Sequence, residues 1–347
     1  MEERPIEGVG AAVHGPALAP PDLSPEARRR HALRSLTGDL TEGDVSPLDL
    51  RARHHWHAHL RQILGRTLAG VWNDGFIHAG NLAYVAIVAL FPFFITVAAI
   101  FSAIGEKDEQ AASINAFLIA VPPSVASAIG PVAHAVIEAR TGWLLWLGGL
   151  VGLWTVGSLI ETIRDILRRA YGTKHTHAFW RYRLLSTGII FGAVILLLLS
   201  LWVQVAIGAV ETAIYAWFPA LDPVLGEIAM TRLIPGFVLF GSVYLLFYSL
   251  TPSRYRHRRY PKWPGALFVS VWWVLVLTAL PWALRRLFHY DATYGSLAGV
   301  MITLFFFWLV GLGMVFGAEL NAALAETPEE SDMIGQADDR ARAAQGK

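Results

Sequence analysis

Long apolar stretches alternate with short charged segments along most of the chain. Uncharged runs occupy 82–104, 143–160, 184–210, 233–250, 264–284 and 297–318. A helix rises about 1.5 Å per residue, so about 20 apolar residues cross a hydrocarbon core of roughly 30 Å. The pattern therefore predicts an all-α fold, a polytopic bundle of six transmembrane helices over 81–325.

Composition supports a membrane location. Of 347 residues, 54% are hydrophobic and 16% are charged, and the mean hydropathy is +0.45. This is too little charge to cover a soluble globule. The net charge of +1 excludes a uniformly basic nucleic-acid binder, and the absence of cysteine excludes disulfides, thiolate metal sites and thiol nucleophiles.

The basic residues are distributed unevenly between the two sides of the predicted bundle. The connecting segments 51–81, 164–183 and 253–263 hold fifteen Lys or Arg, whereas 105–142, 211–231 and 285–296 hold four. Cytoplasmic segments carry the excess of basic residues in membrane proteins. We therefore expect both termini in the cytoplasm, including the acidic tail 326–347, because acidic residues weigh little in this rule.

The segments outside the spans differ in character. Residues 1–50 are rich in Pro, Ala, Gly and Arg without apolar periodicity, which predicts disorder. Residues 51–80 place apolar side chains at helical spacing among four arginines, which predicts a basic amphipathic helix on the cytoplasmic membrane surface. The external segment 106–142 predicts short interfacial or helix-packing helices, with a re-entrant pair as the alternative.

Small and cyclic residues within the runs predict close contacts and bends. Glycine pairs such as Gly313 and Gly317 have the small-xxx-small spacing that lets helices approach closely. Proline removes a backbone donor from a helix and favours a kink. The kink candidates are Pro92, Pro235 and Pro281.

Four stretches resemble the YihY/BrkB family of bacterial inner-membrane proteins, once mislabelled ribonuclease BN. They are LAYVAIVALFPFF at 82–94, IRDILRRAYG with the following FWRYRL over 163–184, the PGA of WPGALFVSVWW at 263–273, and YGSLAGVMITLFFFWLVGLGMVFGAELNAAL at 294–324. The resemblance implies six membrane helices, a multi-pass location in the bacterial inner membrane and a link to envelope integrity. It implies no settled biochemical activity.

Several polar residues lie within or beside the apolar runs. The substrate-path candidates are Glu161, Arg164, Asp165, Gln204, Glu319 and Asn321. Ionisable groups at membrane depth face water or the bundle interior. The alternative is structural: ion pairs or amide bonds that lock helices together. Four arginines near the external ends are candidates for binding anionic headgroups, with snorkelling as the alternative. They are Arg140, Arg232, Arg285 and Arg286.

Catalytic motifs are sparse. His55, His57 and His59 form HWHAH, but the Asp-His that metallo-β-lactamase-type nucleases need after such a pair is missing. There is no nucleophile elbow, P-loop or paired catalytic carboxylates. We therefore expect no enzyme activity, no metal, no cofactor and no nucleic-acid partner.

Two functions fit these observations. The first is a transporter or lipid translocator whose partners are membrane lipids, with an anionic lipid or glycolipid as substrate. Broken helices and intramembrane polar groups favour it, since both are otherwise costly. The second is a non-catalytic scaffold for envelope maintenance, in which every polar group is paired internally. A homo-oligomer is left open.

Overall fold

The computed structural model describes residues 22–38, 56–104, 115, 118–119, 121–138, 143–174, 184, 188, 230–287 and 297–345. Every regular element within these residues is helical, which confirms the all-α prediction for this part of the chain. In chain order the α-helices are α1 (Pro25–Thr37), α2 (Trp56–Gly70), α3 (Phe76–Ile104), α5 (Pro123–Glu138), α6 (Trp143–Ala170), α9 (Met230–Leu250), α10 (Trp263–Leu287), α12 (Ala298–Leu324) and α13 (Pro328–Gln345). A π-helical turn, η2 (Val71–Gly75), joins α2 to α3, and a 3-10 turn, η4 (Ser253–Tyr255), follows α9.

Four helices in the described residues are long and apolar enough to cross a membrane: Phe76–Ile95, Trp146–Ala170, Trp263–Leu284 and Ala298–Leu324. They lie on the predicted spans at 82–104, 143–160, 264–284 and 297–318. The predicted span 233–250 falls on α9, whose apolar part Gly236–Leu250 is shorter. The predicted span 184–210 lies outside the described residues except for 184 and 188. Six spans and the orientation of the termini therefore stay predictions.

The spanning helices pack around α3 and α12. α3 lies against α6 and α12, and α12 also contacts α10. One apolar core joins α6, α9, α10 and α12 through buried side chains such as Leu167, Phe247 and Val269. A second core lies where α5 packs against α3 and α12, around Phe94 and Val125. Within the predicted external segment 106–142, α5 is therefore a helix that packs against other helices.

Glycine permits a close contact between α10 and α12. A Cβ atom at Gly317 of α12 would lie 2.9 Å from the carbonyl oxygen of Gly265 on α10. A Cβ atom at Gly265 would in turn collide with the backbone of Gly317 and the side chain of Asn321. The PGA and GAELN stretches that carry the resemblance therefore meet at one crossing, where only glycine fits.

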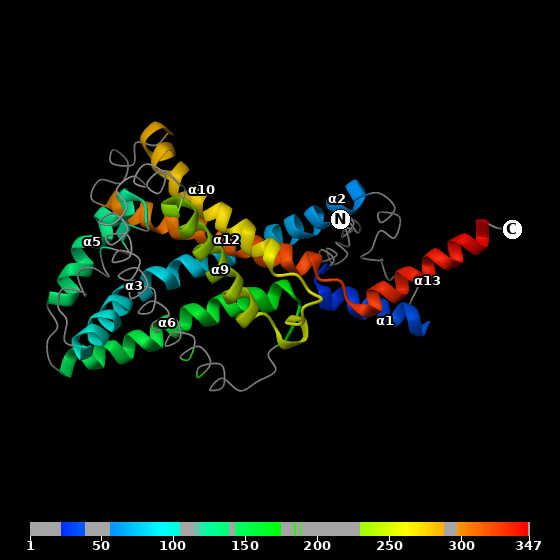
Figure 1. Cartoon of the computed structure of the whole chain (residues 1–347), viewed down its shortest axis with the longest axis horizontal. Helices are drawn as coiled ribbons and strands as arrows, with labels where there is room; N and C mark the ends of the chain where they lie inside the picture. The colour runs from blue at the N-terminus through cyan, green and yellow to red at the C-terminus, as the bar shows by residue number, and fades with distance from the viewer. Residues whose placement is uncertain are drawn as a thin grey trace, which may run out of the picture.

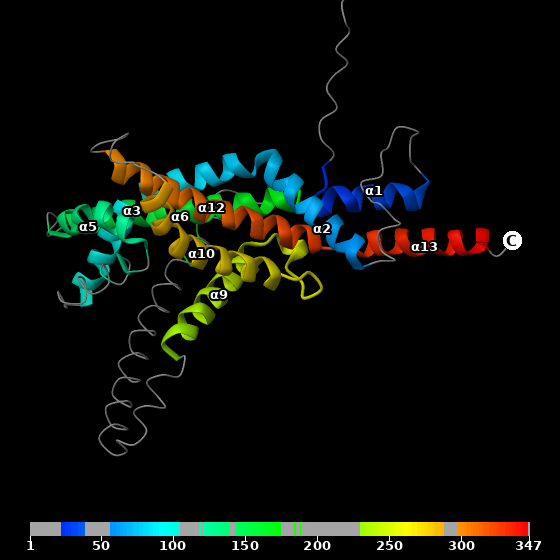
Figure 2. The same ribbon diagram turned by 90° about the horizontal axis from the view of Figure 1, so that it is seen from above.

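The N-terminal prediction is wrong for part of 1–50, because residues 25–37 form α1. Ser24 caps the helix by accepting from the Ala27 N–H at 3.4 Å, Pro25 opens it, and Gly38 ends it with a φ of 76°. These are strong local helix signals. α1 lies beside α13 at the end of the bundle opposite α5 (Figures 1 and 2).

The segments that flank the spans form helices too, and the first of them continues directly into the bundle. From Trp56 onwards the predicted amphipathic segment is helical and runs through η2 into α3. Ile63, Thr67 and Val71 are buried, and α2 packs against α12. Leu64 and Leu68 are exposed on the outer side. Within the tail, Pro328–Gln345 form α13, so both flanks of the bundle contribute helices to the same end.

Candidate functional site

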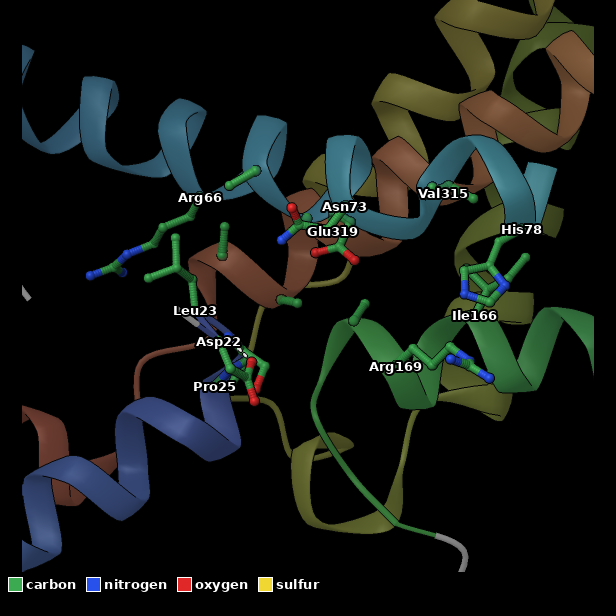
Figure 3. A pocket seen from close by; sticks show the side chains of 17 residues that line it. Asp22, Leu23, Pro25, Arg66, Asn73, His78, Ile166, Arg169, Val315 and Glu319 are labelled. Carbon is green, nitrogen blue, oxygen red and sulfur yellow. Dashed lines mark hydrogen bonds between the residues drawn. The ribbon is translucent and has the colours of Figure 1, made fainter. Parts of the chain in front are cut away.

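Polar side chains from four parts of the chain surround a cavity of about 130 Å³ at the α1–α13 end of the bundle (Figure 3). Its walls come from the start of α1, from α2 through the start of α3, from the last turns of α6, and from the second half of α12. The polar lining residues are Asp22, Ser24, Arg66, Asn73, His78, Arg169 and Glu319. Such a cavity, with charges of both signs, is suited to holding a polar group beside an apolar bundle.

Glu319 is the acidic side chain that α12 contributes to the cavity. It lies directly over Gly70, where a Cβ atom would collide with its carboxylate. Figure 3 shows it in the same part of the cavity as Asn73. Burial raises the pKa of Tyr171, and the negative charge of Glu319 raises it further. The carboxylate is therefore within electrostatic reach of the end of α6.

α6 carries two ion pairs near the cavity, and both form within the helix. Arg164 Nη1 donates to Glu161 Oε1 at 2.7 Å, and the Arg164 side chain is only 4% exposed. Arg169 Nε donates to Asp165 Oδ2 at 3.4 Å on an exposed face. Of these four residues only Arg169 lines the cavity. A substrate path at Glu161, Arg164 and Asp165 stays a prediction.

Asn321 lies beside α10 instead of in the cavity. Its Oδ1 accepts from the Gly265 N–H at 2.8 Å, and its Nδ2 donates to the Lys262 carbonyl at 3.1 Å. The side chain is fully buried. Gly265 is in the first turn of α10, where backbone N–H groups have no partner within the helix. Asn321 thus supplies from α12 the cap that α10 needs.

Lys262 holds the segment before α10. Its Nζ donates to the carbonyl oxygens of Arg256 and His257 at 2.9 and 2.8 Å. Burial lowers the pKa of Lys262 to about 8, and the positive charge of Arg256 lowers it too. The ammonium therefore acts as a fixed donor that closes the turn between α9 and α10.

The remaining candidates are only partly described. Gln204 and Arg140 lie outside the described residues. Arg232 lies on α9 and Arg285 on α10, but their side chains are not among those described. Arg286 is exposed near the end of α10. Pro92, Pro235 and Pro281 lie inside α3, α9 and α10, and the kinks expected there stay predictions.

The sequence pattern did not single out the charged residues that α1 and α13 bring together. Arg28 is fully buried and lies 3.3 Å from Glu330, which is also buried. Arg66 of α2 is 3.9 Å from the same carboxylate. One signal was available: Thr327 and Glu330 have capping-box spacing, and the Glu330 N–H donates to Thr327 Oγ1 at 3.3 Å. The pairing of two helices so far apart in the chain had no local signal.

Comparison with known proteins extends over most of this architecture. The profile of the family described as Virulence factor BrkB matches residues 71–341, from η2 to α13. The chain belongs to the BrkB family. It is 26% identical to the putative ribonuclease-like protein YfkH of Bacillus subtilis, over 73% of this chain and 90% of that protein. No solved structure shows a significant match.

Other relatives are described as membrane proteins. The UPF0761 membrane protein MS0032 of Mannheimia succiniciproducens is 26% identical over 72% of this chain and 84% of its own length. The UPF0761 membrane protein of Alteromonas mediterranea is 24% identical over 78% of this chain and 90% of its own length. Together with the four apolar helices, these names identify an integral membrane protein. The BrkB match includes Glu319 and Arg169 but begins after Arg66 and α1.

Proposed function

We propose that this BrkB-family protein transports or translocates an amphipathic anionic molecule, a lipid or glycolipid, across the bacterial inner membrane in envelope maintenance. The carrying observation is the polar cavity at one end of the apolar bundle, with Glu319 on one wall and Arg66 and Arg169 on others. Guanidinium groups bind phosphate and carboxylate with directional hydrogen bonds. The proposed function does not include an enzyme activity.

The chemistry of the cavity suits a charged headgroup more than a fatty chain. Its lining contains two guanidinium groups, an amide and an imidazole alongside two carboxylates. The outer surfaces of the spanning helices carry exposed apolar side chains such as Phe91, Trp154 and Val271. A headgroup held at the cavity would thus have lipid-facing surface nearby for its acyl chains.

The proposal is tested by reconstitution of the purified protein into liposomes. Scrambling of a fluorescent phospholipid and of an anionic glycolipid is measured for the parent, for Glu319→Gln and for Glu161→Ala. Asp332→Asn on α13 is the charge control, because this residue is exposed and does not line the cavity. We expect scrambling by the parent and the control, with a loss of at least about tenfold in Glu319→Gln, the change that a cost of about 1.4 kcal/mol produces.

A well-folded parent that scrambles none of these lipids would contradict the lipid proposal. That result would favour the scaffold. The scaffold requires polar groups to be paired inside the protein, as the side chains of Arg164 and Asn321 are. Equal scrambling by the parent and Glu319→Gln would instead remove Glu319 from the path.

A further inference from the structure

Arg28 of α1 forms the central contact between the N-terminal helix and the rest of the protein. Its Nη2 donates to the carbonyl oxygens of Ala325 at 2.6 Å and Ala322 at 3.4 Å, where α12 ends. Its Nε donates to Glu330 on α13 at 3.3 Å. A cation placed on the last carbonyls of a helix also meets the negative end of its dipole. One buried guanidinium therefore joins α1 to both α12 and α13.

Further polar contacts surround this centre. Arg29 Nε donates to Glu329 on α13 at 2.8 Å. Glu26 accepts from the Tyr255 hydroxyl at 2.8 Å and from Arg254 Nη1 at 3.2 Å, both in the segment after α9. α1 is thus fastened to two separate parts of the bundle end through charged and hydroxyl groups.

Apolar packing contributes little to this attachment. The buried apolar cluster beneath α1 consists of Ala32, Met333 and Ile334, with Leu36 at its edge. The core between α6, α9, α10 and α12 is much larger and contains aromatic side chains. Exposed and half-exposed ion pairs contribute little net stability, and buried ones are lost when either partner is removed. Detachment of α1 would therefore break polar contacts and leave the apolar core closed.

The start of α1 is also a wall of the cavity. Residues 22–25 line it together with α2, α6 and α12 (Figure 3). Ser24 rests on Gly172, just after α6, where φ is 69° and a Cβ atom would collide with the Ser24 hydroxyl. Any displacement of α1 from Gly172 consequently removes one side of the cavity.

We propose that α1 is a detachable clasp: it closes the cavity while the contacts of Arg28 and Glu26 are intact and exposes Glu319 when they break. The clasp would control access for the proposed substrate, and only this use rests on the proposed function. α1 precedes residues 71–341, which match the BrkB family. Access to the cavity is measured without transport, so failure of the clasp and failure of translocation are distinguishable.

The test exploits the absence of cysteine from the chain. Ala323→Cys introduces a single thiol on a buried residue of the cavity wall, and Ala133→Cys introduces one in the packed face of α5 at the other end. The rate of reaction with a hydrophilic maleimide is measured on full-length protein in nanodiscs. Each reporter is combined with Arg28→Gln or with Arg61→Gln, the same substitution at an exposed site on α2 that does not line the cavity.

We expect Arg28→Gln to raise the labelling rate at position 323 on the order of tenfold or more, because the charge-assisted hydrogen bonds that join α1 to α12 and α13 are lost. Arg61→Gln should leave this rate unchanged, and position 133 should stay slow in both. If Arg28→Gln does not fold, Glu26→Ala replaces it, since alanine has no acceptor for Tyr255 or Arg254. Equal rates at position 323 in the parent and the folded variant would overturn the clasp, as would an equal rise at position 133.

Discussion

Asn321→Ala separates a structural role of the GAELN stretch from a role in transport. In the parent the amide accepts from the Gly265 N–H at 2.8 Å and donates to the Lys262 carbonyl at 3.1 Å. Alanine removes both the acceptor and the donor of this fully buried amide. The N–H of Gly265 then has no acceptor in the first turn of α10, where water does not replace the lost group.

The magnitude follows from these two contacts. A buried backbone group left without its hydrogen bond costs about 1–3 kcal/mol. The Lys262 carbonyl still accepts from the Ala266 N–H at 3.2 Å, so losing the amide costs less free energy at this carbonyl than at the Gly265 N–H. We therefore expect Asn321→Ala to lower the free energy of unfolding by about 2–4 kcal/mol.

The assay is unfolding by SDS in mixed micelles, followed by tryptophan fluorescence. Thr278→Ala is the control, because this exposed hydroxyl on α10 bonds only within its own helix and should change the free energy of unfolding little. Side-chain hydrogen bonds between membrane helices average about 0.6 kcal/mol. A loss no larger than this would refute the capping argument, and unchanged stability with lost scrambling would place Asn321 in the substrate path.

Two further predictions concern the same end of the bundle. Gly317→Ala should lower the free energy of unfolding by about 1–3 kcal/mol, because its Cβ would crowd the Gly265 carbonyl. Gly241→Ala is the control and should not destabilise the protein, because its Cβ would meet no atom within 4 Å. Equal midpoints of SDS unfolding for the two variants would contradict this prediction. Burial lowers the pKa of Lys262 to about 8 from 10.5, so the unfolded chain binds more protons between these values. Thermal stability should rise with pH above about 8 in the parent but not in Lys262→Met.

The four spans that the structure supports were predictable, because an uncharged run long enough for a membrane is a strong signal, but their ends were not. The sequence pattern ended the second span at 160, before Glu161. In the structure α6 continues to Ala170, because the side chains of its last turns pair within the helix, as Glu161 does with Arg164. Where charge begins and where a helix ends are therefore separate questions.

The cavity was only partly predictable for a related reason. Glu319 was recognised as an acidic residue at the end of an apolar run, and the structure places it in the cavity wall. Asp22 and Ser24 belong to a segment of low hydrophobicity that was expected to be disordered. Their position depends on Arg28 reaching Glu330, a contact between residues 302 positions apart. Neither composition nor periodicity reports such a contact.

The basic residues at this end carry two roles at once. Arg66 and Arg254 were counted as markers of the cytoplasmic side, yet Arg254 also binds Glu26 of α1 and Arg66 lies near Glu330. Removing either residue to test orientation would therefore also weaken the clasp. Arg258 lies in the same segment and is exposed. Substituting Arg258 removes one basic residue from the predicted cytoplasmic side and leaves the contacts of α1 in place. It therefore tests the orientation of the protein in the membrane separately from closure of the cavity.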